Sequence, residues 1–164
     1  MKTIQIYILI TLLGLISTAH AEELKVELKS FKAGFAWVTK SADWSASPTV
    51  IYTPRYVLTD KISTGADLGL SYFNLSTDEK FWAYDALFSL DYQHSSTWRA
   101  GFKIGQQYWD HPIKEGIWAS GAELKYSLPK NEDNHFKNFS VEYLRLFDKL
   151  SASIFKLTTT FSIK

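Results

Sequence analysis

The feature that most constrains this chain is a strict alternation of apolar and polar side chains with a period of two residues. It is clearest in FWAYDALFSLDYQ, residues 81–93, where Trp82 and Tyr84 share one parity and Asp85 and Asp91 the other. A period of two is that of a β-strand, whose successive side chains point to opposite faces. After residue 21, no stretch longer than two turns keeps the helical spacing of apolar residues. The alternation therefore predicts an all-β fold.

Alternation of this kind recurs along the chain, in stretches separated by segments rich in Pro, Asn, Asp, Ser and Gly. The eight predicted strands are residues 24–38, 50–60, 62–74, 81–93, 97–109, 117–128, 137–147 and 151–163. Most of them are longer than the roughly five or six residues usual in soluble sheets. A tilted strand needs about 9–11 residues to cross a bilayer. The strand lengths therefore favour a membrane barrel.

Three of the predicted strands break the pattern. In the first, the apolar parity changes near Ser30, which predicts a β-bulge or a short lead-in before the strand. In the second, Pro54 removes a donor from the strand ladder. In the seventh, Tyr143 shares its parity with Arg145 while Leu144 lies opposite, so the inward face is ambiguous.

The two faces of the strands differ in a way that indicates which surroundings each one meets. Aromatic residues lie near both ends of the apolar face, as with Trp98 and Tyr108, ten residues apart. At about 3.3 Å per residue and a tilt of roughly 40°, that separation rises about 25 Å, the height of the apolar band of a membrane barrel. The polar face mixes glycine with both signs of charge. We therefore predict that the apolar face meets lipid. The predicted interface aromatic residues are Trp82, Tyr92, Trp98, Tyr108, Trp118 and Tyr126.

The polar faces would line the interior of a barrel that is only just wide enough to be filled by side chains. The predicted interior charges are Lys32, Arg55, Asp67, Asp85, Asp91, Arg99, Lys103, Glu123, Lys125, Glu142 and Lys156. Both signs occur in similar number, so we expect ion pairs that plug the interior rather than an open pore. The predicted fold is a closed antiparallel up-and-down transmembrane β-barrel of about eight strands.

The first residues have the form of a secretory signal peptide. Lys2 precedes an apolar run over residues 4–16, and residues 19–21, Ala-His-Ala, have the small-x-small form of a cleavage site. The run is shorter than the roughly 20 residues that a membrane-spanning helix needs. We predict a cleaved signal peptide over residues 1–21 and one barrel domain over residues 22–164.

The composition excludes several classes of protein. The chain has no cysteine, so no disulfide framework holds this exported domain. Its formal net charge is +1, which gives no basic field for nucleic acid. It shows no metal-ligand spacing, phosphate-binding loop or catalytic-triad order, so we expect no metal and no cofactor.

The signal peptide, the absence of cysteine, the eight amphipathic strands and the inward charges resemble the small eight-stranded outer-membrane barrels of Gram-negative bacteria, such as the OmpA transmembrane domain and OmpX. The resemblance is architectural and spans the mature chain. It implies an outer-membrane location, a monomer, contact with outer-membrane lipid and lipopolysaccharide, and insertion by the barrel assembly machinery. That machinery reads an alternating last strand, here Phe155, Leu157, Phe161 and Ile163, although Lys164 stands where these proteins carry a terminal aromatic residue.

Some barrels of this size are enzymes, and two residue pairs invite the comparison. His94 lies two residues before Ser96, loosely similar to the His-x-Ser of the lipid A deacylase PagL, but Thr97 stands where that family has asparagine. Asp110 and His111 form a second polar pair in a predicted loop. We expect both pairs to be solvated turns. We therefore expect that the protein is not an enzyme. The alternative is a lipid-modifying hydrolase.

Another alternative remains open from the sequence. A soluble periplasmic barrel that binds an apolar ligand would show the same alternation with its apolar face turned inward. For the membrane barrel we expect a structural or surface-interaction role, with Trp44 and Trp109 as external contact points at loops.

Overall fold

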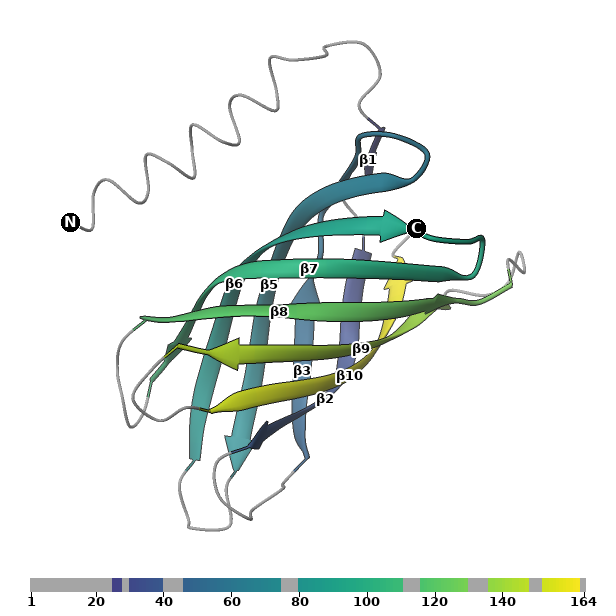
Figure 1. The fold of residues 1–164 in the computed structure, drawn as a ribbon. Coiled ribbons are helices and arrows are strands. Elements are labelled where there is room, and N and C mark those ends of the chain that lie inside the picture. Colours follow the sequence, from purple (N-terminus) through teal and green to yellow (C-terminus); the bar gives the residue numbers. More distant parts are fainter. Residues whose placement is uncertain are drawn as a thin grey trace, which may run out of the picture.

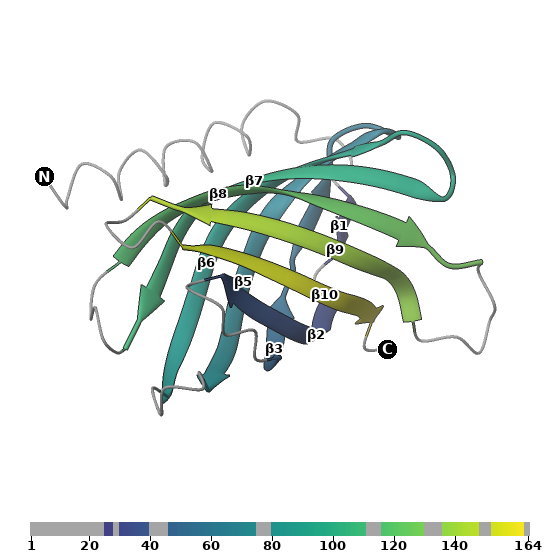
Figure 2. The same ribbon diagram turned by 60° about the horizontal axis from the view of Figure 1, so that its bottom comes forward.

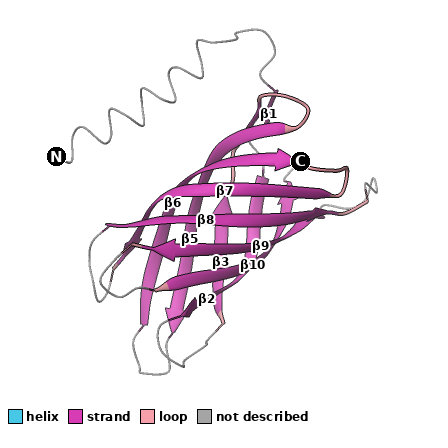
Figure 3. Cartoon of the chain, viewed as in Figure 1, coloured by secondary structure: helices cyan, strands magenta, loops and turns pink. Residues whose placement is uncertain are grey.

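The computed structural model describes residues 25–27, 30–39, 46–74, 80–110, 116–129, 136–147 and 152–162, and the predicted signal peptide lies outside them. In this part of the chain the regular structure is β-strand (Figures 1 and 3). The strands are β1 (Lys25–Glu27), β2 (Ser30–Thr39), β3 (Ser47–Tyr52), β4 (Arg55–Val57), β5 (Ile62–Asn74), β6 (Lys80–Gln93), β7 (Trp98–Trp109), β8 (Gly116–Ser127), β9 (Phe136–Leu146) and β10 (Ser153–Ser162). None of the described residues belongs to a helix long and apolar enough to cross a membrane.

These segments form one closed antiparallel sheet with eight strands in its wall. β1 and β2 together make the first wall strand and β3 and β4 the second, because β1 pairs with β4 and β2 with β3. From β5 to β10 each strand pairs with the next, and β10 returns to pair with β2. Figure 2 shows the strands crossing obliquely on the two sides of the barrel. The predicted closed eight-stranded barrel is confirmed.

The division of the first wall strand matches the parity change in the sequence. Glu27 pairs with Arg55, and Phe31 pairs with Tyr52. The first wall strand therefore has one residue more than the second between these two pairs, which is the signature of a β-bulge. Of the two predicted alternatives, a bulge near Ser30 or a short lead-in, the pairing therefore matches the bulge.

The division of the second wall strand lies at Pro54. β3 and β4 pair with β5 in one continuous register on either side of it. The Ala66 amide donates to the Pro54 carbonyl at 3.3 Å. The proline therefore interrupts the ladder without shifting it.

The register around the wall sets the tilt of the strands and the width of the barrel. In one direction, Leu68 of β5 connects through Tyr52 to Phe31 of β2. In the other direction, Gly65 connects through five intermediate partners to Val38 of β2. The two paths start three residues apart on β5 and end seven residues apart on β2. Going once around the wall therefore shifts the register by ten residues. Strands of such a barrel tilt by about 35–45° and enclose a space that side chains fill.

The two ends of the barrel are named here by the strand ends that lie at each. We call the end where β2 begins and β10 finishes the terminal end; the turns formed by residues 58–61 and 94–97 lie there. We call the opposite end, where β2, β5, β7 and β9 finish, the far end.

Candidate functional site

The outer wall of the barrel is apolar. Large apolar side chains are exposed along the wall, for example Phe35 of β2, Val50 of β3, Leu68 of β5, Phe102 of β7 and Val141 of β9. Each of these five side chains is at least half exposed. The apolar parity of the strands therefore points outward.

The six predicted interface aromatic residues lie in two bands, one near each end of the barrel. All six predicted interface aromatic residues are exposed, by 39% to 48%. The far girdle contains Trp82, Tyr108 and Trp118, and the terminal girdle contains Tyr92, Trp98 and Tyr126. Within the terminal girdle, Trp98 and Tyr126 meet edge to face with ring centroids 5.0 Å apart. Such bands are the arrangement that lipid interfaces favour.

The middle of the barrel interior is filled with five cationic and five anionic side chains, each no more than 6% exposed. We call them the interior charge network. Its members are Lys32, Arg55, Lys103, Lys125, Lys156, Asp67, Asp85, Asp91, Glu123 and Glu142. Equal numbers of both signs allow every charge to be paired, which buried charges require.

Lys103 is the centre of the interior charge network. Its Nζ lies 2.5 Å from Asp67 Oδ2 and 2.9 Å from Glu123 Oε2, and it also contacts Glu142. Oxygen atoms of the three carboxylates lie within 4.8 Å of one another, a spacing that would suit a metal ion. The lysine ammonium occupies that position. Lys32 joins the same group from the facing wall, 2.7 Å from Glu123 and 3.2 Å from Asp67.

One branch of the network runs toward the terminal end. Arg55 connects Asp67 to Asp91, with its Nε 3.2 Å from Asp91 Oδ2. Lys125 lies 2.8 Å from the same Asp91 oxygen and 3.3 Å from Glu123. A Cβ atom at Gly101 would overlap the Asp91 carboxylate, so the missing side chain makes room for this branch.

A second branch runs toward the far end. Lys156 lies 3.5 Å from Glu142 and contacts Asp85. Gln107 donates to Asp85, and the Trp109 indole donates in turn to Gln107 Oε1 at 2.6 Å. This chain of hydrogen bonds connects the ion pairs to the apolar side chains beyond them.

Arg99 differs from the other predicted interior charges. It is half-buried at the terminal end of β7, and its Nη2 donates to Gln93 Oε1 at 2.9 Å. Among the described residues it makes no ion pair, because Arg55 and Lys125 already hold Asp91, the network carboxylate nearest that end. Arg99 therefore points inward but lies outside the interior charge network.

A second interior layer, at the far end, is apolar, in contrast to the fully charged interior that we predicted from the sequence. We call it the apolar plug. Its members are Ala36, Val38, Phe73, Phe81, Ala83, Leu87, Trp109, Ile117, Ala119, Leu144, Leu146, Ala152 and Ile154. Phe81 stacks on Trp109 with ring centroids 4.6 Å apart and contacts Phe73 at 5.2 Å.

The apolar plug corrects one expectation and resolves one ambiguity. Trp109, expected as an external contact point, is 1% exposed inside the barrel. It has the inward parity of Lys103, so strict parity would have predicted its direction. In β9, Leu144 lies inside the plug, whereas Tyr143 and Arg145 face outward. The ambiguous strand is therefore one whose inward face changes from charged to apolar.

The first candidate catalytic pair lies in a solvent-exposed turn, and only one member of the second pair is among the described residues. His94 and Ser96 are exposed in the tight turn at 94–97, where the Ser95 hydroxyl accepts from the Trp98 amide at 3.1 Å. Asp110 Oδ1 accepts from the Trp82 amide at 2.8 Å. His111 and Trp44 lie outside the described residues.

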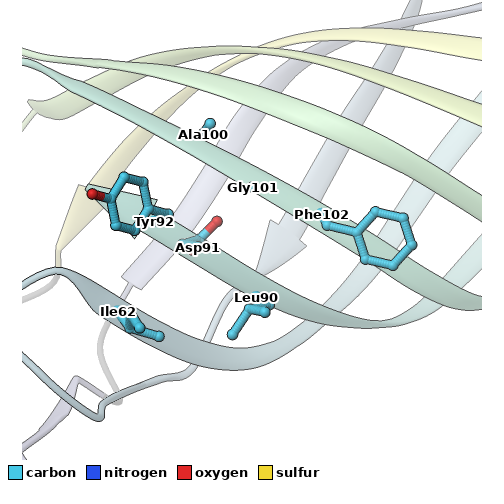
Figure 4. A pocket seen from close by; sticks show the side chains of 7 residues that line it. All are labelled: Ile62, Leu90, Asp91, Tyr92, Ala100, Gly101 and Phe102. Carbon is cyan, nitrogen blue, oxygen red and sulfur yellow. The ribbon is translucent and has the colours of Figure 1, made fainter. Parts of the chain in front are cut away.

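A shallow hollow of about 420 Å³ lies on the outer wall beside the terminal girdle (Figure 4). Its lining consists of Ile62, Leu90, Asp91, Tyr92, Ala100, Gly101 and Phe102. Ala100 is the smallest of the outward-facing side chains in this lining. The hollow belongs to the outer apolar surface and not to the barrel interior.

No protein-family model and no curated protein matches this chain. Solved structures do match. Neisserial surface protein A is 11% identical with a TM-score of 0.61, over 85% of this chain and 99% of that one. The Yersinia pestis outer membrane protein Ail, in a phospholipid bilayer nanodisc, is 12% identical with a TM-score of 0.58, over 86% and 100%.

A barrel from the de novo design of transmembrane β-barrels matches similarly, at 12% identity and a TM-score of 0.55, over 86% of this chain and 100% of that one. At such identities the likeness shows the fold alone. The expected resemblance to small outer-membrane barrels is confirmed at that level: this chain folds as a closed transmembrane-type β-barrel with a buried salt-bridge network in its interior.

Proposed function

We propose that this protein is an integral outer-membrane barrel with a structural or surface-interaction role, exported through a cleaved signal peptide. The observation that carries the proposal is the inversion of the usual soluble arrangement. Exposed apolar side chains surround the wall, while ten charged side chains are buried inside it. A soluble monomer rarely exposes continuous apolar surface of this extent, whereas a lipid bilayer favours it.

The soluble barrel with an internal apolar ligand is not favoured by this arrangement. Its apolar face would have to point inward, where the structure has the interior charge network and the tightly packed apolar plug. Its polar face would have to point toward water, where Phe102 and Leu68 are half exposed.

The proposed protein does not conduct solutes. The interior charge network fills the middle of the barrel, and the apolar plug fills its far end. Moving a solute through would require buried ion pairs to separate, which is costly. Purified protein in a planar bilayer is expected to give no steady channel conductance, and a stable ohmic channel would contradict this part of the proposal.

On this proposal the protein is not an enzyme. It works as a monomer without a cofactor, and it contacts outer-membrane lipid, lipopolysaccharide and the barrel assembly machinery. The exposure of His94 and Ser96 in a short turn supports the absence of catalysis by this pair, because neither side chain is desolvated. Hydrolysis of lipid A acyl chains by the purified barrel that is lost in H94A or S96A would overturn it.

Membrane fractionation followed by electrophoresis of cold and boiled detergent extracts tests the main proposal. We expect the protein to sediment with the outer membrane and to migrate differently after boiling, because a closed barrel resists unfolding by the detergent until it is heated. Recovery in the periplasmic fraction, with the same mobility before and after boiling, would contradict the proposal.

A further inference from the structure

One cation inside the barrel has no anion to balance it. The eleven predicted interior charges are six cations and five anions, and the ten of them that form the interior charge network are paired with one another. The eleventh, Arg99, makes no ion pair with any described residue. It is half-buried at the terminal end, beyond the point where Arg55 and Lys125 share Asp91. The interior therefore carries one uncompensated positive charge, and solvent can reach it.

Arg99 is the middle member of a row of three inward side chains that all carry N–H donors. Gln93 of β6, Arg99 of β7 and Lys125 of β8 are direct cross-strand partners. The Cβ atoms of such partners lie about 4.5–5.5 Å apart, and two like charges placed opposite each other destabilise a sheet. Asp91 lies 2.8 Å from the Lys125 ammonium and balances that charge. An anion between Arg99 and Lys125 would remove the remaining repulsion. We call these three residues the donor row.

The donors of the row are only partly used. Arg99 Nη2 donates to Gln93 Oε1 at 2.9 Å, which engages one of the five guanidinium N–H groups and neither N–H group of the Gln93 amide. The Lys125 ammonium has three N–H groups and meets two carboxylates, Asp91 and Glu123. In the described part of the chain, these contacts leave donors on all three side chains for the oxygen atoms of an anion.

The second oxygen of Asp91 restricts which anion fits. Arg55 and Lys125 both contact Oδ2, whereas Oδ1 is buried and accepts a hydrogen bond from none of the described groups. Asp91 pairs with Gly101, two residues from Arg99 on the same strand (Figure 4), and a Cβ atom at Gly101 would overlap Oδ1. A buried acceptor without a donor is costly. A fitting ligand must therefore supply a donor as well as acceptors.

We propose that the donor row binds inorganic hydrogen phosphate that enters from the terminal end, with the phosphate hydroxyl donating to Asp91 Oδ1. The planar fork of the Arg99 guanidinium matches two oxygens of a phosphate. Inorganic phosphate keeps at least one proton at neutral pH, whereas sulfate and the phosphodiester of a phospholipid keep none. The proton therefore selects among oxyanions of similar shape. The inference goes beyond the proposed structural role and does not depend on it.

The test titrates the isotope-labelled mature barrel, in nanodiscs of phosphatidylcholine at pH 7, with inorganic phosphate. Chloride keeps the ionic strength constant. The NMR signals of the Gln93 side-chain amide and the Gly101 backbone amide report on the site, because both groups lie beside the proposed anion. Both signals are expected to shift and to saturate at the same phosphate concentration. R99Q is expected to weaken binding by about tenfold or more, because it removes the charge-assisted hydrogen bonds.

K61Q is the matched control. Lys61 is an exposed cation in a turn at the same end, and its carbonyl accepts from the Gln93 amide at 2.7 Å, but it is not part of the donor row. K61Q is expected to bind phosphate as the unmodified barrel does. R99K keeps the charge but not the fork, so its affinity is expected to lie between those of R99Q and the unmodified barrel. Sulfate is expected to bind about tenfold more weakly than phosphate, because it leaves Asp91 Oδ1 without a donor.

The inference is overturned if the unmodified barrel gives no saturating shift, if R99Q binds phosphate as tightly, or if K61Q loses as much affinity as R99Q. A shift that appears only when Glu132 and Asp133 are changed to amides would also contradict it, because a carboxylate of the chain itself would then be the counterion. Equal affinity for sulfate would refute the part played by Asp91. A protein that does not enter nanodiscs contradicts the proposed function instead, and the titration is then run in detergent micelles.

Discussion

Replacing Lys103 by methionine tests whether the interior charge network stabilises the barrel as the structure implies. Methionine keeps much of the volume of the lysine, so the variant removes a charge without opening a large cavity. The ammonium is fully buried and contacts Asp67, Glu123 and Glu142. Without it, three carboxylates with oxygens within 4.8 Å of one another lose their shared cation. Removing one partner of a single buried pair costs about 3–5 kcal/mol. We expect at least that loss.

The free energy of unfolding is measured by urea titration of the barrel in phosphatidylcholine vesicles at pH 7, followed by tryptophan fluorescence. Arg99→Met is the matched control, because Arg99 also points inward but lies outside the interior charge network. Its expected loss is within about 1 kcal/mol. Adding Glu142→Gln to Lys103→Met removes one of the three negative charges that Lys103 contacts in the unmodified protein. This second change is expected to restore about 0.5–3 kcal/mol, the range of coupling between residues in contact.

Either of two outcomes would contradict this prediction. If Lys103→Met unfolds at the same urea concentration as Arg99→Met, the buried charges do not depend on their central cation. If Glu142→Gln lowers stability by the same amount with and without the lysine, the two groups are not coupled, and the ion pairs of the interior do not act as a network.

Three further substitutions test other parts of the barrel in the same urea assay. Phe102→Arg places a charge at the middle of the apolar wall and is expected to cost about 2–4 kcal/mol; a variant as stable as the parent would mean that this face does not meet lipid. Gly101→Ala brings a methyl group against the Asp91 carboxylate and is expected to cost about 1–3 kcal/mol. Gly116→Ala, whose added carbon would have its nearest neighbour at 3.4 Å, is its control, and an equal effect of the two changes would refute the packing argument. Trp109→Ala empties the centre of the apolar plug and is expected to cost about 3–5 kcal/mol, and a loss under 1 kcal/mol would show that the plug is loosely packed.

The wall of the barrel was predictable from the sequence because a period of two residues carries direct information on direction. The parity of Trp98 and Phe102 gave their outward direction, and the parity change near Ser30 gave the β-bulge. These are local properties, since each side chain's face depends only on its place in its own strand. The same property places Trp109 inside, as the structure does, and it is a better guide to direction than the position of Trp109 beside a loop.

The charged part of the interior could be predicted in its composition but not in its pairing. That Lys32 faces inward follows from parity, but that it reaches Glu123 depends on the register and curvature of a wall that closes over several intermediate strands. The change from charged to apolar side chains toward the far end could not be predicted either, because no strand contributes more than three residues to the apolar plug. Arg99 has the right parity, and only its position near the end of the barrel separates it from the network.

The pairing of β2 with β10 has a consequence for the order of events in folding. Its ten residue pairs, from Thr39 with Ser153 to Ser30 with Ser162, join positions 114 to 132 residues apart along the chain. Contacts of such long range form slowly, because the intervening chain must first be ordered. Until they form, the sheet has two edges with unpaired N–H and C=O groups, which bind other chains in water and are costly in lipid. Chain closure and membrane insertion are therefore expected to finish as one step, with the first and last strands of the wall meeting last.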